Sequence, residues 1–132
     1  MGGKPVAQED PMGCGIACVA FICAVSYKSA KHLFDMHNDT KPGCYCPDIV
    51  NALQNAGRAY RWRRIGGRRI RYIDRSIIFI KRSRSFPAGH FLARWKGVWM
   101  DPWINLDASN PGVGNARAGF RKRLPGMASY CF

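Results

Sequence analysis

The fold of this chain is decided at residues 89–101, which read GHFLARWKGVWMD. Two apolar runs in this stretch are separated only by Lys96-Gly97, and a two-residue link that ends in glycine is typical of a tight β-hairpin. If the residues on either side of the link pair with each other, His90 lies on the same face as Asp101, one diagonal step away. A diagonal pair is about 7–8 Å apart at the backbone, which an imidazole and a carboxylate can bridge. The hairpin therefore predicts a contact between His90 and Asp101, and a one-residue slip would abolish it.

The part of the chain before this hairpin has the pattern of helices. Residues 14–25 are apolar on every side, which is typical of a buried central helix. Ser26 can cap a second helix that extends to about Met36. Pro47 can start a third helix over residues 48–56.

From residue 58 onward the pattern changes to that of β-strands. Besides the hairpin at 89–101, strands are expected at 60–65, 69–73, 76–81 and 128–132, with Gly66-Gly67 as a second hairpin turn. Residues 105–119 are rich in Gly, Asn and Pro and predict a surface loop. Helices first and antiparallel strands second predict an α+β fold, and the length of 132 residues suits one domain over residues 1–132.

The charge is distributed very unevenly along the chain. The formal net charge is +13, and residues from Arg58 onward contribute seventeen basic side chains against three acidic ones. Such a field favours an acidic partner, which can be a protein or peptide, a nucleic acid or an anionic surface.

The cysteines and the apolar runs indicate the compartment. The sequence shows no signal peptide, and its longest apolar run is shorter than the roughly 20 residues that cross a bilayer. The six cysteines are therefore expected to be mostly reduced. We predict a soluble cytoplasmic protein without a membrane partner, and the sequence leaves its oligomeric state open.

Cys14 stands where a glycine-containing loop ends and the apolar helix begins. The nucleophilic form of cysteine is the thiolate, which a helix N-terminus and a nearby imidazolium both stabilise. A buried core cysteine is the alternative for Cys14 taken alone. Cys18 and Cys23 lie deeper in the predicted helix, where cysteine behaves as a small packing residue.

The order of four short motifs carries more information than any one of them. Gln8 precedes the motif Cys14-Gly15-x-Ala17 by six residues, and a His90-Phe91 strand and an Asp101-Pro102 pair follow. This arrangement resembles the papain-like cysteine peptidases that process the double-glycine leaders of bacteriocins. The resemblance covers roughly residues 6–103.

The resemblance implies a papain-like fold and a catalytic triad. Cys14 would attack a carbonyl carbon, His90 would transfer the proton, and Asp101 would orient the imidazole. The side-chain amide of Gln8 would bind the oxyanion together with the backbone amide of Cys14. The expected activity is cleavage of a peptide or amide bond in a peptide or protein substrate through a thioester acyl-enzyme, without a cofactor. Deamidation or acyl transfer would use the same residues.

The basic segment 58–84 raises an alternative function. Its arginines alternate with Tyr60, Trp62 and Tyr72, so a strand there would present arginines and aromatic rings together. Such a surface suits phosphates and bases, although it is also the composition of a solvated outer sheet face. The alternative is a non-catalytic papain-like module that binds nucleic acid or an acidic protein through an arginine-rich sheet.

A metal site is not expected. Cys44, Cys46, His32 and His37 offer soft ligands close together in the sequence, but they lack the paired CxxC spacing of zinc sites.

Overall fold

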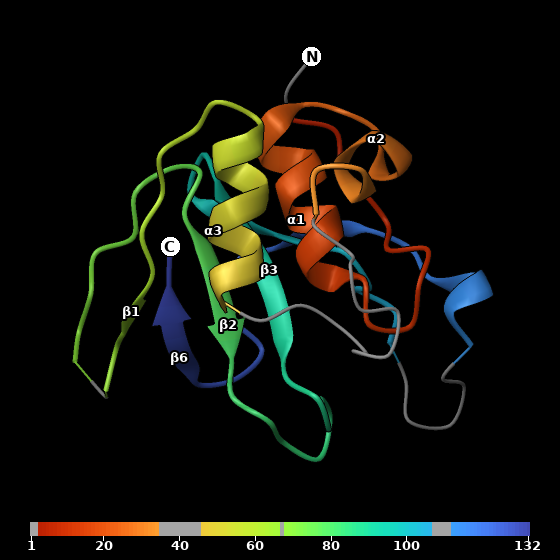
Figure 1. Cartoon of the computed structure of the whole chain (residues 1–132). Coiled ribbons are helices and arrows are strands. Elements are labelled where there is room, and N and C mark those ends of the chain that lie inside the picture. Colours follow the sequence, from red (N-terminus) through yellow and green to blue (C-terminus); the bar gives the residue numbers. More distant parts are fainter. Residues whose placement is uncertain (1–2, 35–45, 67, 107–111) are drawn as a thin grey trace.

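Helices precede strands along the chain, and the two kinds of element form separate layers in the computed structural model (Figure 1). The structure describes residues 3–34, 46–66, 68–106 and 112–132. The helices are α1 (Cys14–Cys23), α2 (Tyr27–Lys31) and α3 (Cys46–Asn55). The strands are β1 (Arg63–Arg64), β2 (Ile77–Ile80), β3 (His90–Trp95), β4 (Val98–Asp101), β5 (Gly119–Arg121) and β6 (Ala128–Cys131). They form one antiparallel sheet in the order β1-β6-β2-β3-β4-β5, which confirms the α+β arrangement.

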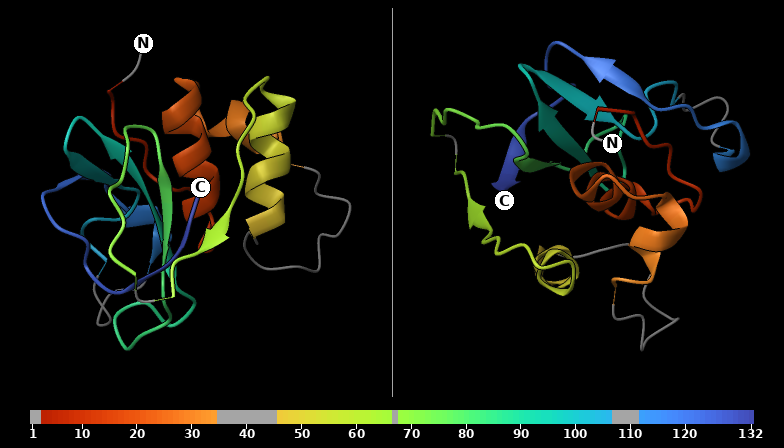
Figure 2. Two further views of the ribbon diagram at one scale, coloured as in Figure 1. Left: turned by 90° about the vertical axis from the view of Figure 1, so that its left-hand side faces the viewer. Right: turned by 90° about the horizontal axis from the view of Figure 1, so that it is seen from above.

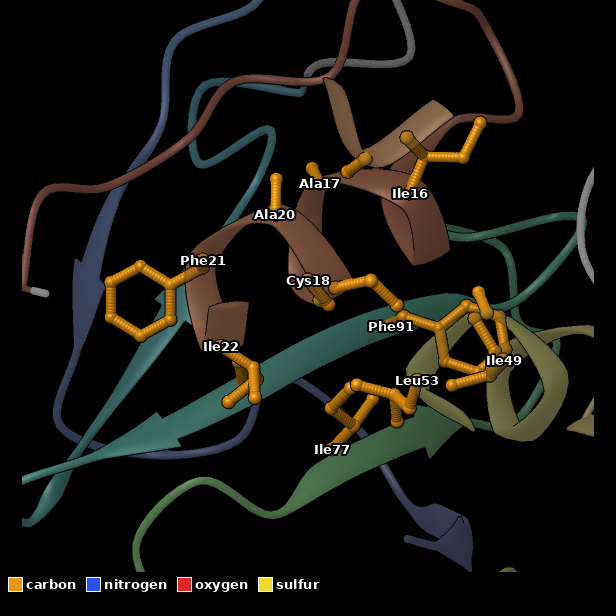
Figure 3. Packing of buried hydrophobic residues seen from close by; sticks show 14 of the residues in the cluster. Ile16, Ala17, Cys18, Ala20, Phe21, Ile22, Ile49, Leu53, Ile77 and Phe91 are labelled. Atoms are coloured by element: carbon orange, nitrogen blue, oxygen red, sulfur yellow. The ribbon is translucent and has the colours of Figure 1, made fainter. Parts of the chain in front are cut away.

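Helix α1 is the centre of the core, as its apolar sequence predicts. It contacts β3 on the sheet and both other helices, and its residues from Gly15 to Ile22 are all buried. Figure 3 shows Ile77 and Phe91 from the sheet meeting Ile49 and Leu53 from α3 beneath it. Full burial of one such side chain stabilises the fold by about 1.5–3 kcal/mol. The helix ends before residue 25 because Ala24 adopts the left-handed conformation, with φ of 56°.

The hairpin at 89–101 forms in the predicted register. Trp95 pairs with Val98 across the turn. The turn residues Lys96 and Gly97 have φ of 46° and 82°, so both are left-handed, as a type I′ turn requires. The turn matches the right-handed twist of the two strands and fixes which side chains share a face.

The face of the sheet that points away from α1 carries a second, smaller core. Ile78 and Ile80 of β2 pack there with Leu92 and Trp99 of the hairpin. Because side chains alternate along a strand, His90 and Asp101 belong to this same face.

Other element boundaries also differ from the predictions. The second helix ends at Lys31, and residue 36, its expected end, lies outside the described residues. Helix α3 begins at Cys46, ahead of the expected start. The loop predicted at 105–119 holds a short 3-10 helix, Val113–Asn115, and the unpredicted strand β5 begins at its last residue.

The predicted hairpin around residues 66 and 67 is wrong, and with it the arginine-rich sheet. Of residues 60–65 only Arg63 and Arg64 are in a strand, and that strand pairs with β6; residues 69–73 are not a strand. A two-residue turn at Gly66-Gly67 would have placed Arg64 opposite Arg69, and like charges directly opposite each other are unfavourable in a β-ladder. Figure 2 shows the segment instead as an extended arm at the edge of the molecule, drawn in yellow-green and green.

Candidate active site

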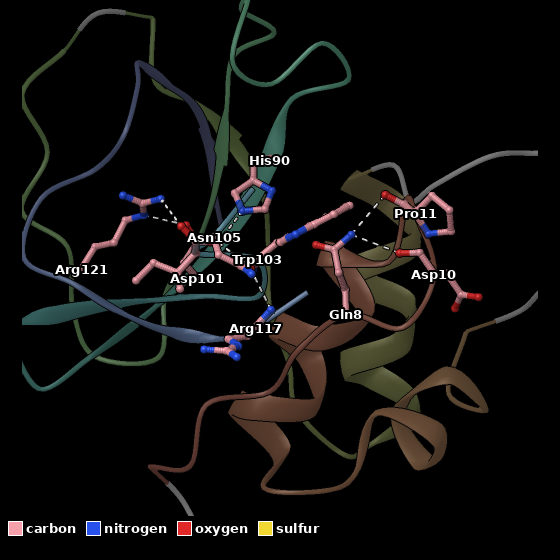
Figure 4. A network of polar contacts seen from close by, with 10 residues as sticks. Gln8, Asp10, Pro11, His90, Asp101, Trp103, Asn105, Arg117 and Arg121 are labelled. Atoms are coloured by element: carbon pink, nitrogen blue, oxygen red, sulfur yellow. Dashed lines mark hydrogen bonds and ion pairs between the residues drawn. The ribbon is translucent and has the colours of Figure 1, made fainter. Parts of the chain in front are cut away.

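The structure places His90 and Asp101 in direct contact. The distance from His90 Nε2 to Asp101 Oδ1 is 2.6 Å, and the two residues are 3% and 0% exposed (Figure 4). The residues come from neighbouring strands, β3 and β4, in the diagonal relation that the hairpin register predicts. The contact expected from residues 89–101 is therefore present.

Asp101 has a second diagonal neighbour, on the other side of β4. In the pairing of β4 with β5, Asp101 lies opposite Gly119 and Trp99 lies opposite Arg121. Arg121 Nε donates to Asp101 Oδ2 at 2.6 Å. The backbone N–H of Trp103 donates to Asp101 Oδ1 at 2.9 Å. Both oxygens of the buried carboxylate thus have hydrogen-bond donors, and the carboxylate is held in one orientation.

These contacts set the charge states of the pair. Burial alone would raise the pKa of Asp101, but His90, Arg121 and the backbone N–H of Trp103 lower it below its usual range. Burial alone would lower the pKa of His90, but the hydrogen bond to Asp101 and the side chain of Cys14 raise it to about 9. The ring is therefore mostly an imidazolium at neutral pH.

Cys14 is the first residue of α1 and is partly exposed. Its side chain lines a cavity of about 800 Å³, and His90 and Gln8 line the same cavity. The Cys14 side chain also contributes to the raised pKa of His90. Because Nε2 of the ring is bonded to Asp101, Nδ1 is the ring nitrogen that remains for a group in this cavity.

A glycine precedes Cys14 and another precedes His90, and the packing around each glycine leaves no room for a side chain. A Cβ on Gly13 would overlap the hydroxyl of Tyr27. A Cβ on Gly89 would overlap the ring of Phe79, and φ at Gly89 is +78°. The chain can approach these neighbours closely only without a side chain at either position.

Gln8 lies in the same cavity but is turned toward its own loop. Its Nε2 donates to the backbone carbonyls of Asp10 and Pro11, each at 3.1 Å (Figure 4). Its Oε1 is buried and has no hydrogen-bond partner. The backbone N–H of Gln8 donates to Pro102 O at 3.2 Å, which ties this loop to the end of β4. The structure therefore places Gln8 near Cys14, with its side-chain N–H groups already used by carbonyl groups.

Sequence reasoning missed two residues of this site. Arg121 had no local signal, because a three-residue strand becomes visible only through its pairing with β4. Phe86 stacks on the His90 ring, with ring centroids 4.7 Å apart and an angle of 10° between the planes. Phe86 lies in an irregular segment, whose path in space the sequence does not indicate.

The residues considered as metal ligands do not form a site in the part of the chain that the structure describes. No group of three or more His, Cys, Asp or Glu side chains converges within those ranges. Cys44 and His37 lie outside the described residues. Cys14, Cys23, Cys46 and Cys131 are not in disulfide bonds.

No family model, curated protein or solved structure matches this chain. Among the helices that the structure describes, none is long and apolar enough to cross a membrane. The resemblance to papain-like peptidases accordingly stays a prediction from the sequence motifs.

The contact between Arg121 and Asp101 predicts a change in pH dependence. In Arg121→Met the carboxylate keeps its charge but loses its cationic partner, so it interacts more strongly with His90 and the pKa of His90 should rise above about 9. We expect the midpoint of the His90 ring titration to move to higher pH. NMR spectra of the ring C–H groups recorded from pH 6 to 10 would check this. An unmoved midpoint would indicate that Arg121 only supports the fold.

Proposed function

We propose that this protein is a papain-like cysteine peptidase or amidase that uses Cys14, His90 and Asp101 as a catalytic triad. The observation that carries the proposal is the buried 2.6 Å contact between His90 and Asp101 beside a cavity that Cys14 also lines. The resemblance of the motifs around Gln8 and Cys14 to double-glycine-leader peptidases agrees with this assignment.

The proposed reaction has two steps. The Cys14 thiolate attacks the carbonyl carbon of a peptide or amide bond, and the His90 imidazolium gives its proton to the departing amine. The product of this step is a thioester between Cys14 and the acyl part of the substrate. Neutral His90 then takes a proton from water, whose oxygen attacks the thioester and restores the thiolate and imidazolium. Asp101 keeps the ring oriented throughout and stabilises its charge.

Oxyanion stabilisation would come first from the backbone N–H of Cys14. This group belongs to the first turn of α1, where N–H groups have no acceptor within the helix. A contribution from Gln8 would require its amide to turn away from the carbonyls of Asp10 and Pro11. The buried Oε1 has no hydrogen bond to lose in such a rotation.

The cavity suggests a peptide or protein substrate in an extended conformation. Aromatic side chains form much of its wall, and Lys81 and Arg82 stand at the same cavity. The substrates that fit this chemistry carry apolar side chains near the cleaved bond and tolerate or prefer acidic residues. Cys46 also lines the cavity, which provides an internal comparison for Cys14.

The test is selective alkylation with limiting iodoacetamide at about pH 6.5, followed by mass spectrometry of each cysteine-containing peptide. Cys14 should react about a hundredfold faster than Cys46, because burial raises the pKa of Cys46 to about 11. His90→Ala should slow the labelling of Cys14 by at least about tenfold, since the imidazolium is lost.

The control is Cys46→Ala, which removes a thiol from the same cavity. Labelling of Cys14 should be unchanged in this variant. Equal rates for Cys14 and Cys46 in the wild-type protein, or no effect of His90→Ala, would contradict the proposed triad.

A further inference from the structure

The basic segment between α3 and β2 forms a defined surface next to the candidate active site, whose cavity Trp62 of this segment also lines. We call residues 58–75 the arginine arm; residue 67 within it lies outside the described residues. Seven arginines of the arm are exposed, namely Arg61, Arg63, Arg64, Arg68, Arg69, Arg71 and Arg75. The single acidic residue of the arm, Asp74, accepts a hydrogen bond from the backbone N–H of Lys96. The arm therefore has a large excess of positive charge on an exposed surface.

The arm is closed by a contact within it and is fixed to β6 at two places. Tyr60 Oη donates to Arg75 O at 2.9 Å, which closes the base of the arm. The arm also contributes β1, which pairs with β6. Beyond β1, Ile65 is buried, and its backbone N–H donates to Ser129 O at 2.8 Å. The arginines are thus presented by an anchored backbone, which reduces the entropy lost when a ligand binds.

A cavity of about 400 Å³ lies against the arm. Its lining combines apolar side chains with three arginines and one indole: Arg61, Trp62, Arg63, Ile70, Arg71, Ile73, Ser76, Cys131 and Phe132. Trp62 is 43% exposed, and its ring makes an edge contact with Tyr130 at 5.5 Å between centroids. An exposed, supported aromatic ring beside guanidinium groups is the arrangement on which unpaired bases stack.

We propose that the arginine arm binds single-stranded nucleic acid, with phosphates on its arginines and a base in this cavity against Trp62. A polynucleotide supplies one negative charge for each base, so one partner offers both phosphates for the arginines and a flat ring for Trp62. An acidic peptide matches the charge but provides no regular series of flat rings. The two proposed activities use different reacting groups, since neither Cys14 nor His90 lines this cavity, but Trp62 lines both this cavity and the one beside His90.

The test is the fluorescence anisotropy of a labelled oligothymidylate of about 15 nucleotides, titrated with the full chain at several salt concentrations. Arg63→Glu/Arg71→Glu should weaken binding by at least about thirtyfold and lower the salt slope by about 1.4, or about 0.7 for each lost phosphate contact. The matched control is Lys122→Glu/Arg123→Glu, which makes the same change of charge at two exposed residues outside the arm. The control should lose no more than about threefold.

A second pair of variants tests the role of the aromatic ring. Trp62→Ala should weaken binding about tenfold, while Trp62→Phe, which keeps a ring, should retain most of the affinity. Circular dichroism would verify that each variant is folded. Equal losses in the two charge-reversed variants would overturn the assignment of the site to the arm. Tighter binding to polyglutamate or to phosphatidylserine vesicles than to the oligonucleotide would overturn the nucleic-acid assignment.

Discussion

Cys14→Ala should abolish the cleavage of any peptide or amide that the wild-type protein hydrolyses. The variant keeps the cavity, the His90–Asp101 pair and the arginine arm, but it cannot form the thioester. Loss of the nucleophile of such a triad lowers kcat by at least about 10⁴-fold. A library of quenched fluorogenic peptides, screened first with the wild-type protein, would supply the substrate for this comparison.

The matched control is again Cys46→Ala, because Cys46 lines the same cavity. It should retain kcat within about twofold, since it takes no part in the proposed reaction. Thermal unfolding should show both alanine variants to be folded, because truncating one partly exposed thiol costs at most about 1 kcal/mol. Turnover in Cys14→Ala at the wild-type rate would remove Cys14 from the mechanism.

Asp101→Asn should change both the pH dependence and the stability. The amide keeps one oxygen for His90 and Trp103, but it presents an NH₂ group to Arg121 and carries no charge. The pKa of His90 should fall below about 9, because the negative partner that raises it is gone. The alkaline limb of kcat/KM should therefore move to lower pH, opposite to the shift expected for Arg121→Met. We expect about a tenfold loss of kcat/KM at neutral pH.

The stability of the wild-type protein should fall as pH rises from 6.5, the usual pKa of histidine, to about 9, the pKa of His90 in the fold. A folded-state pKa of about 9 lies above the usual value of 6.5, so the protonated ring stabilises the fold fully below about pH 6.5. This contribution is lost as pH rises through about 9. Asp101 has the opposite effect at acidic pH. Its pKa is lowered in the fold, so the ionised carboxylate stabilises the fold above pH 3.8, the usual pKa of aspartate. This contribution is lost as pH falls through the lower pKa of Asp101 in the fold.

Asp101→Asn should remove most of this dependence between pH 6.5 and 9. It should also lower the free energy of unfolding at neutral pH by about 2 kcal/mol, because charge-assisted hydrogen bonds to a buried carboxylate are lost. Urea titrations at about pH 6 and pH 9 for both proteins would measure these differences. An unchanged pH dependence in the variant would show that His90 does not draw its raised pKa from Asp101.

The α+β arrangement and the hairpin were predictable because they follow from local patterns. Helix α1 is apolar on all sides, and such a segment must be buried. The Lys96-Gly97 turn fixes the register of β3 and β4, and the register alone places His90 beside Asp101. The same reasoning failed for residues 69–73, because alternation of residue types does not account for which side chains would lie opposite each other, here Arg64 and Arg69.

The sequence by itself determined the order of the layers, the central helix and the pairing of His90 with Asp101, since each depends on residues that are close together in the chain. Only the tertiary structure decided that β5 pairs with β4 and brings Arg121 to the second oxygen of Asp101. It also decided that Phe86 covers the His90 ring and that Gln8 bonds to its own loop. These contacts join segments whose local sequences carry no signal for one another, so their free energy is gained only when the whole core has assembled.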